Sequence, residues 1–194
     1  MSFDPNYIIF SLSAYLLGSI STAIITCKLM ELEDPRSVGS NNPGATNVLR
    51  TGGKKAAIIT LLGDMLKGLL PVLVVQQLSP DAIALAITGV SAFLGHLYPV
   101  YYRFKGGKGV ATFYGVLLGA NWMIGLIALA VWVLTMLAFR ISGLSALVSA
   151  TSSPFIAWYL GGSEVLIIAV SFMATLLIWR HRSNIRQMLG NDQT

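Results

Sequence analysis

The polar residues that could carry chemistry gather in three segments of an otherwise apolar chain. The longest covers residues 34–50, is dense in small residues, amides and hydroxyls, and ends in Arg50. Gly39 and Gly44 can adopt positive φ, and bare backbone N–H groups beside such glycines form concave sites for anions. An arginine adds a bidentate cation. This segment predicts a phosphate site rather than an ordinary capped loop, with these side chains as contacts: Ser40, Asn42, Thr46 and Asn47.

The second segment places two lysines around two glycines where a helix is expected to begin. It reads Phe104-Lys-Gly-Gly-Lys-Gly-Val-Ala-Thr112. A helix start favours phosphate because its N–H groups are free and its dipole is positive, and Lys105 or Lys108 would add charge. A nucleotide-binding P-loop is disfavoured because Lys108 is followed by Gly109 instead of serine or threonine. A flexible turn whose lysines only mark the cytoplasmic side fits this segment equally well.

The third segment follows the last apolar run and contains His181 and Asn184 at positions i and i+3. An imidazole and an amide therefore share a helix face beside several arginines. Alone, such a segment is typical of a basic anchor for anionic lipid headgroups. His96 is the only other histidine, and neither has further ligands at metal-binding spacing. We therefore expect no metal site and no cofactor.

An acid and a base also lie inside an apolar run. Asp64 and Lys67 are three residues apart and share one face of the expected helix. Ionisable groups at that depth are costly in free energy and usually form pairs that line a polar cavity. The two residues could contact substrate or form a purely structural ion pair, and the sequence favours neither. A role for Asp64 as a general base is less favoured.

The composition indicates that a membrane surrounds these segments. The chain is 55% hydrophobic and only 11% charged, with a mean hydropathy of +0.71, whereas soluble domains carry roughly 25% charged residues. Unpaired backbone is not tolerated in lipid, so apolar runs predict helices, and spans of about 20 residues would use nearly all of the chain. We predict one all-α membrane domain, residues 1–194, with seven transmembrane helices at about 7–27, 55–78, 82–102, 110–120, 122–139, 143–161 and 164–180.

The fourth of these runs, 110–120, is short, so the number of spans falls to five or six if it does not cross. No cleavable signal peptide is expected, because only Asp4 precedes the first run and no basic stretch does. The first run therefore stays as a helix.

The basic residues predict the orientation in the membrane. The net charge is +5, but the cations lie in loops between apolar runs, which favours membrane topology over nucleic-acid binding. With the N-terminus outside, every lysine and arginine except Lys67 falls on one side, the cytoplasm. The polar stretches 29–53, 103–109 and 181–194 then share that side and can form one site for two phosphates. A channel, or a carrier for a phosphorylated solute or lipid, is the alternative from another class.

These residues resemble the acyl-phosphate:glycerol-3-phosphate acyltransferases of the PlsY type. The resemblance spans nearly the whole chain, in the family's order, and is carried by Gly18-Ser19-Ile20, Gly39 to Arg50, Gly63-Asp64 with Lys67-Gly68, Gly95-His96 with Pro99, Phe104 to Thr112, and His181-Arg182 with Asn184-Ile185. It implies a seven-helix bundle in the bacterial inner membrane, with its active site toward the cytoplasm and no obligate protein partner. The implied reaction moves a fatty acyl group from acyl phosphate to the 1-hydroxyl of glycerol 3-phosphate, giving lysophosphatidic acid and phosphate.

The resemblance also implies roles for individual residues. By matching position, the leading substrate-site residues are Ser40, Arg50, Lys105, His181 and Asn184. As a mechanistic hypothesis, Arg50 and Lys105 bind phosphate, and we expect a Lys105→Ala variant to lose activity. Ser40 holds the acyl-phosphate head, while His181 and Asn184 position glycerol 3-phosphate. Either His181 or a substrate phosphate oxygen takes the hydroxyl proton. The supporting polar contacts are Asn42, Thr46, Asn47 and Lys108.

The sequence departs from the family pattern at two places. Asn41 stands where glycine is common, although asparagine visits the left-handed region better than most residues. The tail beyond Ile185 diverges and is assigned no role.

Overall fold

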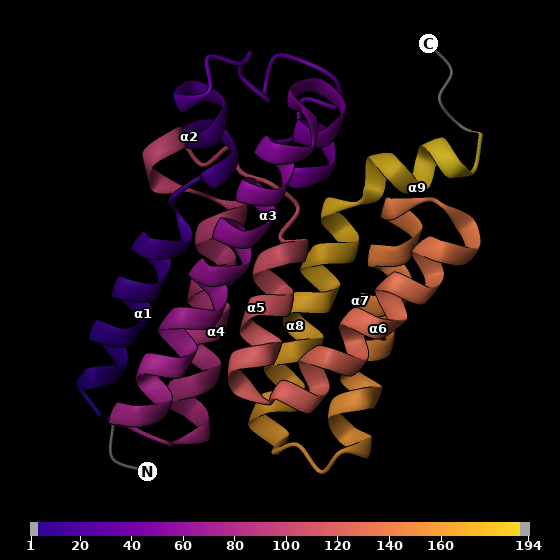
Figure 1. Cartoon of the computed structure of the whole chain (residues 1–194). Coiled ribbons are helices and arrows are strands. Elements are labelled where there is room, and N and C mark those ends of the chain that lie inside the picture. The colour runs from indigo at the N-terminus through magenta and orange to yellow at the C-terminus, as the bar shows by residue number, and fades with distance from the viewer. Residues whose placement is uncertain (1–3, 191–194) are drawn as a thin grey trace.

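The computed structural model describes residues 4–190, and every regular element in that range is helical (Figure 1). The all-α fold predicted from the apolar runs is confirmed. The helices pack side by side as a bundle, with long loops gathered at one end. Their bounds are α1 Asn6–Gly18, α2 Thr22–Leu29, α3 Ala45–Leu78, α4 Ala82–Leu97, the 3-10 helix η1 Val100–Tyr102, α5 Val110–Ala120, α6 Trp122–Phe139, α7 Ser142–Tyr159, α8 Glu164–Arg180 and α9 Arg182–Met188.

Each of the seven predicted runs is helical, but not all of them can cross a bilayer by length and composition. Within residues 4–190, four segments can: Asn6–Leu29, Ala45–Leu78, Ala82–Tyr102 and Trp122–Phe139. A fifth is reached if α8 and α9, which are bent by 55°, count as one span. The serine-rich α7 is not among these segments, because its 18 residues are less apolar than the 18-residue windows that identify them. The predicted count of seven is therefore only partly supported.

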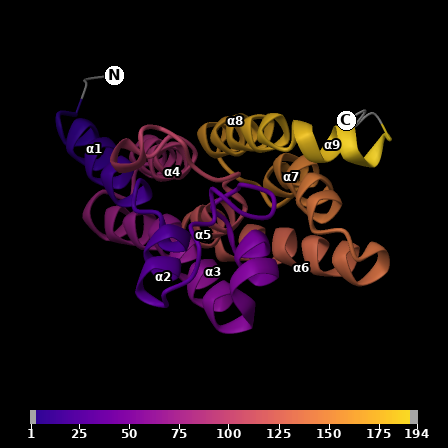
Figure 2. The same cartoon turned by 90° about the horizontal axis from the view of Figure 1, so that it is seen from above.

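The short helix α5 is the clearest departure from a simple span. Its 11 residues extend about 16 Å, roughly half of the hydrocarbon thickness. Viewed along the bundle (Figure 2), α5 lies in the middle, in contact with α3, α4, α6 and α8. Gly68 and Gly115 allow α3 and α5 to approach closely, because a methyl group at either position would clash with the facing helix backbone. A central helix can be short because protein, not lipid, surrounds it.

The boundaries of the predicted loops also shift. The first apolar run is broken between α1 and α2, where the Lys67 ammonium donates to the Ile20 carbonyl at 2.7 Å. α3 begins at Ala45, so part of the predicted loop 29–53 is helical, with a backbone break at Gly53 (φ 82°, ψ 178°). The predicted tail 181–194 contains α9, and its residues 191–194 lie outside the described part.

Candidate functional site

The ends of the bundle differ in how their helices begin. From α3 to α8 successive helices run in opposite directions, so α3, α5 and α7 begin at the loop-rich end, whereas α4, α6 and α8 begin at the other (Figure 1). Helix α1 also begins at that other end, without a side-chain cap. Side chains cap the second group, namely Asp81 on α4, Asn121 on α6 and Ser163 on α8. No side chain caps α3, α5 or α7. Free N–H groups and positive dipole ends, which favour anions, are therefore left at the loop-rich end.

These uncapped starts adjoin one another. The Thr46 hydroxyl of α3 lies 3.2 Å from the Ser142 hydroxyl of α7. Gly107, just before α5, faces the Pro43 carbonyl, since a methyl group there would lie 3.2 Å from that oxygen. Gly143 of α7 packs against the Asn184 side chain of α9. Ser142 and Gly143 were not singled out from the sequence, although a Ser-Gly pair opening a helix on the basic side is a usable signal.

Lys108 is the cation at the centre of this end. Its ammonium is partly buried and donates to the Asn184 side-chain carbonyl. Burial, and then the positive charges of Arg180 and Arg50, lower the pKa of Lys108 below its ordinary value.

Among residues 4–190, the ion pairs join Asp34 to Arg36 and Asp64 to Lys67 and His96. No carboxylate therefore neutralises Lys108, Arg50, Arg180 or Lys105 in that range. Lys108, Arg50 and Arg180 form a cluster of cations that is suited to anions.

His181 completes the cluster with a buried, neutral imidazole. Its side chain follows α8, and Nδ1 lies 2.8 Å from the Leu177 carbonyl. That oxygen can only accept, so we assign the proton to Nδ1, which leaves Nε2 as a hydrogen-bond acceptor. Burial lowers the pKa of His181 to about 4, and the nearby charges of Lys108 and Arg180 add to this shift. His181 is therefore uncharged at neutral pH.

We expect His181 to make the folded state less stable in acid. Its pKa is about 4 when folded and about 6.5 when unfolded. The contribution of the neutral His181 to the free energy of unfolding is complete above about pH 6.5. It is lost as the pH falls toward 4, because the unfolded chain then binds the proton better than the folded chain does. The loss by pH 5 is about 2 kcal/mol. Thermal unfolding in detergent between pH 8 and pH 5 should show a smaller decline for His181→Gln, and equal declines would contradict this.

Asn47 shapes the loop that precedes α3. Its side chain is 2% exposed, and its amide nitrogen donates to the carbonyls of Pro35 at 2.8 Å and Val38 at 3.0 Å. Its side-chain oxygen accepts the Ser40 N–H at 2.8 Å. Asn47 was predicted as a substrate contact, but these bonds direct it into the loop. The Ser40 side chain remains exposed, and Asn41 adopts the left-handed conformation (φ 54°).

We expect Asn47→Ala to release this loop without unfolding the bundle. The variant removes three hydrogen bonds whose backbone partners can then reach water, at a cost of about 2 kcal/mol. Limited proteolysis should cleave between residues 34 and 44 faster than in the parent protein. Asn42→Ala is the control, because no hydrogen bond of the Asn42 side chain occurs within residues 4–190. Equal cleavage of both variants would show that Asn47 does not hold the loop.

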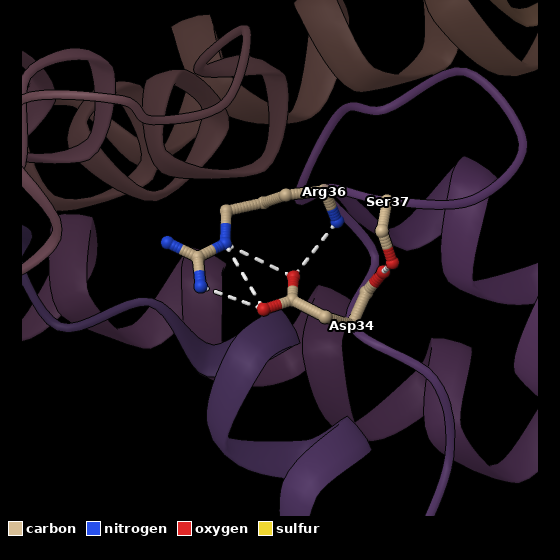
Figure 3. A network of polar contacts seen from close by, with 3 residues as sticks. All are labelled: Asp34, Arg36 and Ser37. Carbon is tan, nitrogen blue, oxygen red and sulfur yellow. Dashed lines mark hydrogen bonds and ion pairs between the residues drawn. The ribbon is translucent and has the colours of Figure 1, made fainter.

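A second set of contacts within the same loop centres on Asp34 (Figure 3). The Arg36 guanidinium binds Asp34 through Nε at 3.0 Å and Nη2 at 2.6 Å, and the Ser37 hydroxyl donates to the Asp34 carbonyl. The Arg36 side chain also lies over the Tyr102 ring of η1, 5.9 Å from its centroid. The hydrogen bond from Arg36 holds the pKa of Asp34 below its usual range. Unlike Arg50, Arg36 is thus neutralised and serves the loop.

The structure places Asp64 and Lys67 beneath this end of the bundle and not within the cluster. Both are buried, with Lys67 Nζ 2.8 Å from Asp64 Oδ1 and His96 Nδ1 3.6 Å from the same oxygen. This favours the structural ion pair over the substrate contact. His96 connects the pair to the site, because its carbonyl accepts the Gly107 N–H at 3.2 Å.

Lys105 also lies apart from the other predicted residues. Its side chain is exposed, and its ammonium makes no hydrogen bond or ion pair among the described residues. The predicted residues that do converge are Thr46, Arg50, Lys108, His181 and Asn184.

The fold and the site together define an all-helical membrane protein with an anion-receptive cluster at one end. The sequence model of the family described as glycerol-3-phosphate acyltransferase matches residues 8–191. The chain therefore belongs to that family of membrane acyltransferases of phospholipid synthesis, and the resemblance inferred from its motifs is confirmed.

Individual relatives match over most of their length. The glycerol-3-phosphate acyltransferase of Thioalkalivibrio sulfidiphilus is 56% identical over 94% of this chain and 90% of its own. That of Methylococcus capsulatus is 52% identical over 93% of this chain and 91% of its own. The crystal structure of PlsY, an integral membrane glycerol 3-phosphate acyltransferase, in its glycerol 3-phosphate form is similar with a TM-score of 0.92. It is 36% identical, covering 97% of this chain and 94% of that chain.

Proposed function

We propose that this protein transfers a fatty acyl group from acyl phosphate to the 1-hydroxyl of glycerol 3-phosphate, yielding lysophosphatidic acid and phosphate. The observation that carries the proposal is the group of cations without carboxylate partners beside three uncapped helix starts. Both substrates carry a phosphate, so one cluster of positive groups serves both. An acyl phosphate is already activated, and the protein mainly has to orient the hydroxyl and stabilise negative charge.

Each converging residue has a role in this proposal. Lys108, Arg50 and the α5 start bind phosphate, with Lys105 as an outer cation, while Ser40 holds the acyl-phosphate head. Asn184 and His181 position glycerol 3-phosphate, and the Nε2 atom of His181 accepts the hydrogen bond of its attacking hydroxyl. Asn42 and Thr46 supply further polar contacts.

The proton and the leaving group balance without a covalent intermediate. The hydroxyl oxygen bonds to the acyl carbon, and the bond from that carbon to the phosphate oxygen breaks. The His181 imidazole orients the hydroxyl by accepting its hydrogen bond at Nε2, and we assign the proton itself to the phosphate. An oxygen of the departing phosphate takes the proton, because the trianion released when the bond breaks is strongly basic, and the product is hydrogen phosphate.

We place the protein in the bacterial inner membrane with the site and the C-terminus cytoplasmic and the N-terminus outside. The cations of the loop-rich end support this orientation, because basic loops remain in the cytoplasm. The loops of the other end carry Asp4, Asp81 and Glu164 and no lysine or arginine. Glycerol 3-phosphate is a charged, water-soluble molecule that can reach a site on that face.

The test supplies purified protein in lipid with palmitoyl phosphate and glycerol 3-phosphate, and follows phosphate release and lysophosphatidic acid. Palmitoyl-CoA is the parallel donor. Product from acyl phosphate alone supports both reaction and donor, whereas product from the CoA ester contradicts the donor. Counterflow of labelled glycerol 3-phosphate in vesicles, with no acylated product, would favour a carrier instead.

A further inference from the structure

We propose that Arg180 is a positioning residue that aims the backbone N–H groups ahead of α5 at a substrate phosphate. The inference rests on the proposed function and assigns a role to a cation that the sequence explains only as a marker of topology. Arg180 ends α8, whereas the loop it contacts, residues 103–109, precedes α5.

The guanidinium of Arg180 binds two successive carbonyl groups of this loop. Nη2 donates to Gly106 at 2.8 Å and to Gly107 at 3.0 Å, and Nε donates to Gly107 at 3.2 Å. The same group lies over the Tyr98 ring, 5.7 Å from its centroid. No acidic side chain pairs with Arg180 in the described part of the chain. Its donors therefore hold backbone, and its charge is not neutralised.

Fixing a carbonyl also fixes the N–H of the same peptide group. A trans peptide is planar, and its C=O and N–H point in opposite directions, and no described peptide bond here is cis. With the Gly106 carbonyl on Arg180, the Gly107 N–H points to the other side and donates to the His96 carbonyl at 3.2 Å. With the Gly107 carbonyl on Arg180, the Lys108 N–H points away from the guanidinium.

This Lys108 N–H is left free for a ligand. It donates to no backbone or side-chain acceptor within residues 4–190. The uncapped first turn of α5 follows it, starting from Gly109 at φ 89°. Arg180 thus sets the direction of the first donor in a row of N–H groups, beside the Lys108 ammonium. Such a row, at the positive end of a helix, is suited to a phosphate.

His96 and Arg180 contact the loop 103–109 from opposite sides, and the space at Gly106 and Gly107 is too small for a side chain. A methyl group on Gly106 would lie 2.0 Å from the His96 carbonyl oxygen, and one on Gly107 would lie 2.3 Å from His96 Nε2. His96 supports the loop from beneath, and Arg180 holds it from the α8 side. Substituting His96 would also disturb the buried ion pair of Asp64, whereas Arg180 can be substituted without changing that pair.

Arg180 could instead act only as one more positive charge near the phosphate. Lysine distinguishes the two roles, because it keeps the charge but lacks the planar fork that binds two carbonyls together. A role through charge alone predicts that Arg180→Lys behaves as the parent protein does. A role in positioning predicts that it does not.

The experiment measures KM for each substrate, kcat and the inhibition constant of inorganic phosphate for the full chain in lipid. The variants are Arg180→Lys and Arg180→Gln. The control is Arg186→Gln, which removes an exposed cation of α9 that makes no hydrogen bond or ion pair within the described residues. We expect KM for one phosphate-bearing substrate to rise about tenfold in the lysine variant and about 100-fold in the glutamine variant. The control should stay within about twofold of the parent, as expected for a screened surface charge.

The substrate whose KM rises identifies the phosphate that the loop holds. Unchanged KM values and phosphate inhibition in Arg180→Lys, or a loss confined to kcat, would overturn the proposal. Thermal stabilisation by inorganic phosphate is measured alongside, since it needs no reaction. If the parent protein binds phosphate but rejects acyl phosphate, the proposed donor fails while the positioning role is still tested. If Arg180→Gln does not fold, the KM values of Arg180→Lys alone distinguish positioning from charge. If the parent protein does not bind inorganic phosphate, the inference is refuted.

Discussion

Replacing Lys108 with alanine should lower kcat/KM for acyl transfer about 10³-fold, because the variant removes a partly buried cation that no carboxylate neutralises. Charge that develops on the substrate in the transition state is stabilised most strongly by such fixed, partly desolvated groups. Lys108 also donates to Asn184, so the variant frees a residue proposed to hold glycerol 3-phosphate. Initial rates with palmitoyl phosphate, at saturating and limiting glycerol 3-phosphate, measure the effect.

Two other lysines serve as comparisons for this variant. Lys105 is exposed and outside the Lys108–Asn184 contact. Lys105→Ala should therefore cost about tenfold or less, as expected for a solvated charge, instead of the loss of activity expected from the sequence alone. Lys54, exposed on α3 beyond the Gly53 break, should be replaceable without effect. Near-complete activity of Lys108→Ala beside an inactive Lys105→Ala would reverse the assignment of the phosphate-binding lysine.

The need for an unneutralised cation at Lys108 can also be tested by adding a negative charge beside it. Asn184→Asp keeps the shape of the side chain but places a carboxylate beside the Lys108 ammonium. The pair would neutralise the cation and repel phosphate, so we expect a loss of about 10²-fold or more. If the aspartate variant retains full activity, an uncompensated cation at Lys108 is not what binds the substrate.

Much of the fold follows from the apolar runs, but their composition does not reveal what surrounds each helix. The prediction for α8, residues 164–180, coincides with the helix Glu164–Arg180. Residues 110–120 also form the predicted helix, yet a helix buried in protein and one facing lipid are equally apolar. Sequence alone therefore could not identify α5 as a half-length helix at the centre of the bundle.

The candidate site was predictable in its polar character and not in its contacts. Asn47 was recognisable as an amide in a glycine-rich loop, but its partners at Pro35 and Val38 depend on the path of that loop. Arg180 was interpreted as a topological charge because the carbonyls it binds are more than 70 residues away in the sequence. Long-range hydrogen bonds to backbone leave no spacing pattern, so they are the part of a site that needs a structure.

Replacing His181 with alanine should reduce kcat/KM by about 10³-fold, as expected when a group that orients the attacking hydroxyl is lost. The imidazole has two separate functions in the structure. Nδ1 binds the Leu177 carbonyl and fixes the ring, whereas Nε2 has no partner among the described residues. Only Nε2 can therefore accept a hydrogen bond from substrate.

Two amides separate these functions, because asparagine places its polar group near the position of Nδ1 and glutamine near that of Nε2. His181→Asn should keep the bond to Leu177 and the stability of the fold, and yet be as inactive as the alanine variant. His181→Gln should be less stable but about tenfold more active than His181→Asn, since its amide oxygen can still accept from the hydroxyl. A fully active His181→Asn would show that the ring only holds the end of α8, and the orienting role would then belong to another group, for which Asn184 is the nearest candidate.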